Sequence, residues 1–363
     1  MSRLKIGVIG CGAIAQIQHL PHLRELDDRF EIGGICDISD YLLDKVGDDF
    51  HVPAARRFSD YHELLASDID GVIVCSSGNH VAPTLAAIGA AKHVLVEKPA
   101  CTTVDEAREM TRTAEEAGVV FMVAYMKRYD PGFIFAKQRI ARMGEVSFVQ
   151  VNHFHPDNEL HTAEFRFHRA IDIPPEAREA ALAEDNAEVD AALGLQPASP
   201  EQRGAFNLIL GSLIHDIGNL HGLFGPPERV LHTEIWLGGR AVSTMLEYPG
   251  CIRAVMNWVD LPELWDFEET LAIYGSRERV TVSFPTGFAR GLTTDVTVVE
   301  IDGELNPSRK FAQWHENAFK NELAHFGDCI RNGREPITPG REVIDDTALV
   351  REIVLAWQGN GAN

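Results

Sequence analysis

The sequence predicts an α/β domain built on a doubly wound parallel sheet, followed by an α+β domain with a largely antiparallel open sheet. Short apolar runs alternate with helix-like stretches over the first third of the chain, which is typical of parallel sheets. After about residue 125 the runs become longer and alternate apolar with polar residues, as in a sheet covered on one side. The length of 363 residues exceeds what one hydrophobic core usually serves. We therefore expect domains at residues 1–125 and 126–363.

The strands predicted in the first domain are short and apolar on both faces, because helices should cover both sides of the sheet. We expect these strands at 4–9, 31–36, 71–75, 93–96 and 119–123. The helices between them are expected at 14–26, 41–49, 61–66, 81–90 and 104–117. Pro21 should kink the first helix, since proline has no backbone N–H to donate.

The second domain shows alternating runs that predict strands at 146–154, 229–237, 241–248, 252–259, 269–274, 279–284 and 295–301. In one of them, Ile252, Ala254, Met256 and Trp258 share a face. A helical excursion rich in Ala, Glu and Asp interrupts the sheet at about 165–205. We interpret it as a solvated insertion in preference to a lid or an oligomer contact.

Composition and charge limit the partners. The chain is 45% hydrophobic and 24% charged, as in ordinary globular proteins, and its net charge of −21 argues against nucleic-acid or anionic-membrane binding. The 6 cysteines are scattered without a C-x-x-C pair, which indicates buried thiols in a reducing compartment. The N-terminus lacks the apolar region of a signal peptide, and no run approaches the roughly 18 apolar residues of a membrane span. We expect a cytoplasmic protein.

A glycine-rich turn with the pattern G-x-G-x-x-A joins the first predicted strand to the first predicted helix. The first glycine permits the tight turn, and the second lets the backbone approach a pyrophosphate. The helix then offers N–H groups and a positive dipole end to the phosphates. The pattern predicts a dinucleotide-binding Rossmann domain, although such turns also occur for packing alone. The predicted cofactor contacts are Gly10, Gly12, Ala13 and Ile14, with Ala15 allowing close packing of the helix.

Asp37 ends the second predicted strand, where a carboxylate can accept hydrogen bonds from the adenosine ribose. A carboxylate there repels a 2′-phosphate, and no arginine follows it. We therefore expect NAD rather than NADP as the cofactor. The alternative is that Asp37 caps the next helix.

Two further segments, at 75–80 and 97–99, follow strands at the edge where open α/β sheets bind ligands. The second is Glu-Lys-Pro, for which a surface ion pair stopped by proline is the alternative interpretation. The cofactor contacts expected along this edge are Ser76, Ser77, Asn79, His80, Glu97 and Lys98.

These motifs together resemble the Gfo/Idh/MocA family, the glucose-fructose oxidoreductase and inositol dehydrogenase group. The resemblance runs in order through segments 10–15, 77–80, 92–94 with 97–99, 125–131 and 330–336, and it leaves out about 160–205. It implies an NAD-dependent oxidoreductase acting on CH–OH groups. It also implies that Lys98 hydrogen-bonds the reacting hydroxyl and that Lys127 contacts the substrate.

Segment 211–218 is similar to the family's Asp-x-x-x-His helix. His215 falls on the histidine that serves as general acid/base, and we expect Ser212 and His215 to contact the substrate. The Asp position holds Gly211, which implies a larger pocket, a carboxylate from elsewhere or weaker chemistry. Asp216 points about 100° away round a helix and is a poor substitute.

His153 and His155 align with substrate contacts on the strand that enters the second domain, and period-two alternation puts both imidazoles on one face. H-x-H on a strand is also a common pair of metal ligands, but no third ligand is evident from spacing. We expect sugar contact and no metal, with surface histidines as the structural alternative.

The expected reaction is hydride transfer from a secondary hydroxyl of a sugar, cyclitol or glycoside to NAD. His215 would take the hydroxyl proton and Lys98 would stabilise the developing negative charge. Two rivals stay open: a glycosidase that uses NAD for transient oxidation and elimination, and a non-catalytic NAD-binding regulator. The missing Asp leaves room for a regulator, whereas the presence of both Lys98 and His215 argues against it. We also expect a homo-oligomer, a dimer or tetramer, because the second sheet exposes a face.

Overall fold

The computed structural model describes residues 2–264, 266–288, 290–301, 303 and 306–359. These residues form two compact units. The first contains the chain up to Tyr125 together with Phe165–Ala192 and Phe319–Thr347. The second contains Met126–Glu164, Leu193–Ala318 and the residues from Ala348 onward.

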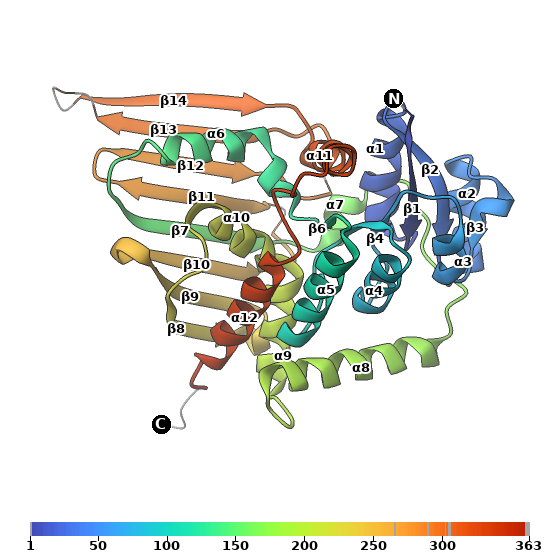
Figure 1. The fold of residues 1–363 in the computed structure, drawn as a ribbon. Helices are drawn as coiled ribbons and strands as arrows, with labels where there is room; N and C mark the ends of the chain where they lie inside the picture. The colour runs from blue at the N-terminus through green and yellow to red at the C-terminus, as the bar shows by residue number, and fades with distance from the viewer. Residues whose placement is uncertain (1, 265, 289, 302, 304–305, 360–363) are drawn as a thin grey trace. The chain divides into compact units, whose positions relative to one another are not determined.

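The first unit is built on a six-stranded parallel sheet in the order β3-β2-β1-β4-β5-β6 (Figure 1). The order reverses beside β1, and such a switch point is where open α/β sheets bind ligands. The strands predicted from the sequence are present, and a two-residue strand, β3, was not predicted. The strands are β1 (Leu4–Ile9), β2 (Phe30–Cys36), β3 (Arg57–Phe58), β4 (Gly71–Val74), β5 (His93–Val96) and β6 (Phe121–Val123).

The first predicted helix divides into a π-helical turn, η1 (Ala15–His19), and α1 (Leu20–Glu25). The change falls beside Pro21, which cannot donate the hydrogen bond that would continue the turn before it. Apart from α8 and the start of α12, which are described below, the other helices of this unit are α2 (Asp40–Asp49), η2 (Ala54–Arg56), α3 (Tyr61–Ala66), α4 (Val81–Gly89), α5 (Val104–Ala117) and α11 (Ala318–Asn332).

The second unit is built on an eight-stranded mixed sheet in the order β14-β13-β12-β11-β7-β10-β9-β8. All neighbouring pairs are antiparallel except β7 and β10, which run parallel. The sequence predicted all of these strands except β14, whose residues are mostly exposed. The strands are β7 (Val146–His155), β8 (Arg229–Trp236), β9 (Ala241–Tyr248), β10 (Ile252–Asp260), β11 (Glu268–Gly275), β12 (Glu278–Phe284), β13 (Thr294–Ile301) and β14 (Pro307–Trp314).

Helices lie against this sheet, and α6 contacts β12, β13 and β14. Asp130 caps α6 by accepting hydrogen bonds from the backbone N–H groups of Gly132 and Phe133. The elements are η3 (Met126–Tyr129), α6 (Pro131–Ile140), α7 (Asn158–Thr162), α9 (Pro200–Leu208), η4 (Ile209–Leu213), α10 (Ile214–Phe224), η5 (Leu237–Gly239) and η6 (Pro249–Cys251). The helix α12 (Glu342–Leu355) begins in the first unit and ends in the second.

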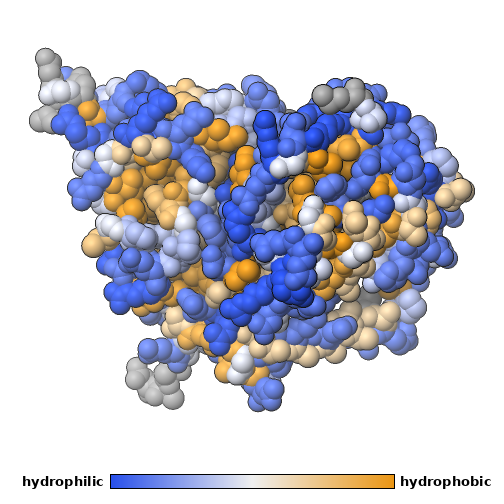
Figure 2. Space-filling view, viewed as in Figure 1, coloured by the Kyte–Doolittle hydropathy of each residue, from blue (hydrophilic) through white to orange (hydrophobic). Residues whose placement is uncertain are grey.

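The predicted insertion holds one long helix, α8 (Pro175–Leu193), and most of its residues are exposed. Alanine and acidic residues alternate along it, and they give the pale orange and blue surface where α8 lies (Figures 1 and 2). None of the helices in the described ranges combines the length and the apolar character that a bilayer crossing requires.

Helix α11 packs closely on the parallel sheet and carries a buried acid. A Cβ on Gly327 would lie 2.5 Å from the Phe30 ring, so only glycine fits at this approach. One turn earlier, Glu322 is fully buried and neither carboxyl oxygen has a hydrogen-bond partner. Burial, and then the negative charge of Glu97, raise the pKa of Glu322 well above its usual range. Burial therefore favours the protonated, neutral form of this carboxyl group in the folded protein.

This raised pKa predicts a stability that falls as pH rises. Above the ordinary pKa of a glutamate, Glu322 ionises in the unfolded chain but keeps its proton in the folded chain. The free energy of unfolding therefore falls as pH rises from that ordinary pKa to the raised pKa of the folded state. Glu322→Gln cannot ionise and should raise Tm at pH 8 by about 2 °C or more, with little change at pH 4. Thermal unfolding of both proteins across this pH range checks it, and parallel curves for the two proteins would contradict it.

Candidate active site

The glycine-rich turn after β1 has the geometry that a pyrophosphate requires. Gly10 has φ +97°, and a Cβ there would lie 2.4 Å from the backbone of Ser76. At Gly12 a Cβ would meet no atom within 4 Å, so space is open beside the backbone. Ala15 is fully buried where the helix packs on the sheet. Both glycines and Ala15 therefore fit a bound dinucleotide.

Asp37 lies at the end of β2 and bridges two backbone segments. One of its carboxylate oxygens accepts from the N–H of Cys11 at 2.7 Å, and the other accepts from the N–H of Ser39 at 2.9 Å. The aspartate thus joins the glycine-rich turn to the start of α2. It does not cap α2 itself, because the Ser39 hydroxyl accepts from the Leu42 N–H there.

The loop after β4 is held by side chains that were expected to bind cofactor. The imidazole of His80 lies 2.7 Å from the carbonyl oxygens of both Ser76 and Pro99, so it ties this loop to the one after β5. Asn79, one residue before the N-cap of α4, accepts from the N–H groups of Val81 and Ala82 at 2.7 and 3.3 Å. These contacts shape the edge of the sheet on which Ser76 and Ser77 lie.

Glu97 forms a buried pair that the sequence did not predict. Its Oε1 lies 2.7 Å from Nε2 of His19, which follows the glycine-rich turn, and both side chains are almost fully buried. Burial raises the pKa of Glu97, but the hydrogen bond and charge of His19, with the charge of Lys98, outweigh it and lower the pKa overall. The interpretation of Glu97 and Lys98 as a mere surface ion pair is therefore wrong for Glu97, whose partner is a buried imidazole.

In the second unit, strand register places Trp258, His153 and Glu269 side by side, and Lys127 reaches the last of them from η3. On β7, His153 pairs with Trp258 of β10 on one side and with Glu269 of β11 on the other. Lys127, on η3, contacts the carboxylate of Glu269. His153, Glu269 and Lys127 are only 2%, 1% and 5% exposed. The row therefore carries an imidazole, a carboxylate and an ammonium group away from bulk water.

Asp216 completes this cluster from α10. Its Oδ2 lies 3.0 Å from Nδ1 of His153, and Nε2 of the same ring lies 3.9 Å from Oε2 of Glu269. Burial raises the pKa of Glu269, and the charge of Asp216 adds to this, whereas the Lys127 ammonium opposes it. Asp216, His153, Glu269 and Lys127, here called the acid–base row, thus form a chain in which carboxylates alternate with nitrogen groups.

His155 lies beside the acid–base row, as period-two alternation predicted. Its ring stacks on Trp258 with centroids 5.7 Å apart and lies 5.6 Å from the His153 ring. Burial, followed by the charge of His153, lowers the pKa of His155 to about 4. His155 is therefore neutral at working pH, and because its Nδ1 donates to the Pro156 carbonyl at 2.5 Å, its Nε2 is left to accept a hydrogen bond. Neither histidine is an ordinary surface residue.

The residue types of His153, Asp216 and Glu269 suit a divalent metal, and one ligand atom of each lies within 4.8 Å of the others. His153 presents Nδ1 to Asp216, whereas its Nε2 lies 3.9 Å from Oε2 of Glu269 and forms no hydrogen bond among the described residues. The two nitrogens diverge, so an ion bound at Nε2 would leave the contact of Nδ1 with Asp216 in place. That the site holds no metal therefore stays a prediction.

His215 is buried on α10, directly before Asp216, and a π-helical turn, η4, precedes this helix. Such turns are frequent at functional sites. A Cβ on Gly211, in η4, would meet no atom within 4 Å, so this glycine does not serve close packing. Ser212 accepts a hydrogen bond from the indole N–H of Trp258 at 2.9 Å. The π-helical turn is therefore fastened to Trp258, the β10 residue that pairs with His153 of the acid–base row.

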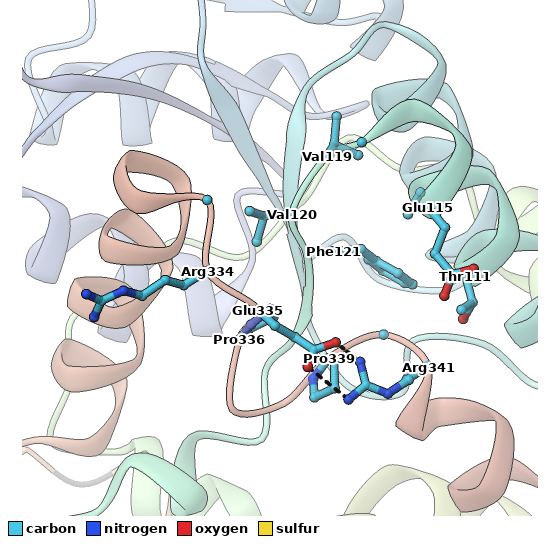
Figure 3. Close-up of a pocket in the computed structure, with 14 residues that line it drawn as sticks. Thr111, Glu115, Val119, Val120, Phe121, Arg334, Glu335, Pro336, Pro339 and Arg341 are labelled. Atoms are coloured by element: carbon cyan, nitrogen blue, oxygen red, sulfur yellow. Dashed lines mark hydrogen bonds and ion pairs between the residues drawn. The ribbon is translucent and has the colours of Figure 1, made fainter.

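A pocket of about 260 Å³ lies elsewhere in the first unit, lined by the end of α5, β6 and the loop between α11 and α12 (Figure 3). Arg341 and Glu335 form an ion pair at its wall. It contains none of the residues predicted to bind cofactor or substrate, so we assign it no part in the site.

Sequence reasoning missed His19, Asp216 and Glu269. Glu269 was recognised only as a strand residue, because the register of β11 on β7 has no local signal. Asp216 was considered only as a partner for His215, and the structure pairs it with His153. Two further acids, Asp172 and Glu188, contact the cofactor edge from the insertion.

Comparison with known proteins agrees with this geometry. Residues 4–125 match the family model described as oxidoreductase family, NAD-binding Rossmann fold. An inositol 2-dehydrogenase of Paracoccus denitrificans is 36% identical over 157 residues, 42% of this chain and 46% of that protein. A scyllo-inositol 2-dehydrogenase (NADP(+)) of Bacillus subtilis is 32% identical over 166 residues, 42% of this chain and 43% of that protein. The chain thus spans about half the length of the relatives it matches.

Solved structures resemble nearly the whole chain in fold. A putative NADPH-dependent oxidoreductase of Desulfitobacterium hafniense has a TM-score of 0.76 at 17% identity and covers 98% of this chain and 96% of that chain. KijD10, a 3-ketoreductase of Actinomadura kijaniata solved with NADP and TDP-benzene, has a TM-score of 0.72 at 17% identity and covers 98% of both chains. These structures show the fold, and residues 4–125 show the cofactor domain. Residues 4–125 are therefore an NAD-binding Rossmann domain of the Gfo/Idh/MocA oxidoreductase type, and the chain as a whole shares the fold of these solved structures.

Proposed function

We propose that this chain is a dehydrogenase that oxidises a secondary hydroxyl of a sugar, cyclitol or glycoside, with NAD as the hydride acceptor. The observation that carries the proposal is the acid–base row, which joins two carboxylates to an imidazole and an ammonium group on the strands beside the helix of His215. The inositol dehydrogenases among the relatives support a polyol as the substrate class.

Lys98 and His215 are proposed as the catalytic residues. A lysine ammonium stabilises the negative charge that develops on the reacting oxygen, and an imidazole has an unperturbed pKa near working pH, which suits a general base. NAD, when bound, supplies the hydride-accepting ring. His153, His155, Lys127 and Ser212 are proposed to bind the remaining hydroxyls of the substrate.

Unpartnered buried atoms support substrate binding at the acid–base row. Nε2 of His153, Oδ1 of Asp216 and Oε2 of Glu269 are buried and have no hydrogen-bond partner among the residues that the structure describes. Leaving such a group unsatisfied costs about 1–3 kcal/mol. A ligand with several hydroxyl groups offers both donors and acceptors and can satisfy these atoms, directly or through a bound water.

The cofactor role rests on the edge of the parallel sheet. Gly12 leaves room for the pyrophosphate, and we propose that Asp37 accepts from the ribose hydroxyls with the lone pairs that its two backbone contacts leave free. The other proposed contacts are Gly10, Ala13, Ile14, Ser76, Ser77, Asn79, His80, Glu97 and Lys98. We further propose that the chain works as a homo-oligomer.

A panel of cyclitols, free sugars and glycosides, scored by the absorbance of NADH, tests the function. Formation of NADH with a polyol or glycoside supports a dehydrogenase. Release of an aglycone without net formation of NADH would contradict the dehydrogenase and indicate an NAD-dependent glycosidase. Binding of NAD without turnover of any substrate would contradict it and indicate a regulator.

The catalytic pair gives a direct prediction. Lys98→Ala and His215→Ala should each lower turnover by about two orders of magnitude or more, the usual scale for a lost acid/base or charge-stabilising group. The affinity for NAD should change far less in His215→Ala, because this residue belongs to the second unit. Steady-state kinetics with NAD titrations check both statements. Near-normal turnover of His215→Ala would show that another residue is the base.

The open space at Gly211 predicts a change of selectivity. Gly211→Asp should fold with nearly unchanged Tm, because its Cβ meets no atom within 4 Å and the two residues differ little in helix propensity. The new carboxylate should fill room that a bulky glycoside needs, so kcat/KM for a glycoside relative to its free sugar should fall about tenfold or more. An unchanged ratio would refute the idea that this glycine provides room.

NAD should bind at least about tenfold more tightly than NADP, because Asp37 repels a 2′-phosphate at short range. The relatives do not decide this choice, since some of them use NADP. Isothermal titration with both cofactors measures it. Equal or tighter binding of NADP would remove this role from Asp37.

A further inference from the structure

Part of the insertion belongs to the cofactor domain. Residues Phe165–Ala192, here called the strap, cluster with the parallel sheet and not with the domain that surrounds them in sequence. The coil that precedes α8 (Figure 1) contacts η1 through His168 and the start of α2 through Asp172. The strap is therefore placed to act on the dinucleotide site.

Backbone and side-chain hydrogen bonds fasten the strap at both ends. The Gln16 side chain accepts from the N–H of His168 at 2.7 Å and donates to its carbonyl at 2.9 Å. At the other end, Glu188 on α8 accepts from Asn79 and Thr102, each at 3.2 Å. Gln16 follows the glycine-rich turn, and Asn79 lies in the loop after β4. The strap thus spans the edge that a dinucleotide occupies.

Between these ends, Asp172 contacts the turn that follows β2. Its Oδ1 accepts from the hydroxyl of Ser39 at 2.5 Å, and its Oδ2 accepts from the N–H of Tyr41 at 3.0 Å. These hydrogen bonds lower the pKa of Asp172, the one from Ser39 most, so its carboxylate stays charged. Ser39 is fully buried under this contact.

The donors of this turn are already used by carboxylates of the chain. The N–H of Ser39 donates to Asp37, and the hydroxyl of Ser39 and the N–H of Tyr41 donate to Asp172. They lie at the start of α2, where the helix dipole and the first N–H groups favour an anion. In a Rossmann domain this turn lies next to the ribose, so the same donors would receive a 2′-phosphate.

We propose that Asp172 is a cofactor-specificity residue: it fills the anion position at the start of α2 from the strap and thereby excludes the 2′-phosphate of NADP. This rests on the proposed binding of NAD at Asp37. A phosphate carries about −1.5 to −2 charges at pH 7, so it would have to displace Asp172 and then lie beside Asp37. The adenosine of NAD brings only hydroxyls to this position and meets no such barrier.

The test uses the full chain and removes the charge of Asp172 while keeping its shape. Asp172→Asn should lower the Kd for NADP about tenfold and leave the Kd for NAD within about twofold. Titration with adenosine 2′,5′-bisphosphate and with 5′-AMP isolates the 2′ position from the rest of the cofactor. The gain should appear only with the bisphosphate and should shrink at high salt. Asp172→Ala, which also removes the hydrogen bonds, should give a gain in the same direction.

Glu184→Gln is the matched control, because it removes one acid from an exposed position of α8 and no other residue contacts it among the hydrogen bonds and ion pairs of the described residues. It should change none of the four affinities by more than about twofold. Unchanged binding of NADP in both Asp172 variants overturns the specificity role while the proposed function stands. If Glu184→Gln gains as much affinity for NADP as the Asp172 variants do, the effect comes from net charge alone, and the specificity role of Asp172 is overturned as well. If the unaltered chain binds neither dinucleotide, the proposed function fails together with the inference.

Discussion

The cofactor edge depends on one close approach, that of Gly10 to the backbone of Ser76. A Cβ at Gly10 would lie 2.4 Å from Ser76, and its φ of +97° is one that side-chain-bearing residues rarely adopt. This approach brings the turn after β1 against the loop after β4. The same turn reaches Asp37 through the N–H of Cys11. A larger residue at position 10 would separate these loops, and the surface that receives the dinucleotide would be lost.

Features with a short sequence period were predictable, and those set by long-range register were not. The parallel sheet follows from apolar runs, and the glycine-rich turn follows from a fixed spacing. The pairing of His153 with Glu269 depends on how β11 aligns with β7, which no local pattern encodes. The contact of Asp172 is harder still to predict from the sequence, because an exposed acid in a polar insertion cannot be told from any other solvated residue until its partner, Ser39, is known.

The helix of His215 illustrates where a correct motif still misleads. The sequence identified the missing Asp at Gly211 and treated the region as one regular helix. The structure has a π-helical turn there, which is a local change of hydrogen bonding that residue types alone do not indicate. The same helix carries a carboxylate at Asp216, directly after His215, and its Oδ2 lies 3.0 Å from Nδ1 of His153. The chain therefore keeps a carboxylate near the predicted base but directs it to another imidazole.

The acid–base row is better explained by chemistry than by stability. Burying charged groups costs several kcal/mol each, and apolar residues of similar size often stabilise a fold as well as a buried ion pair does. A row of His153, Asp216 and Glu269 with three unpartnered atoms adds a further cost. The surrounding strands supply apolar residues such as Val151 and Leu271, so this part of the sheet could have been packed without charges. The row is understandable if a polar ligand forms hydrogen bonds with those three atoms when it binds, because those bonds would offset the free-energy cost of leaving the atoms unpartnered.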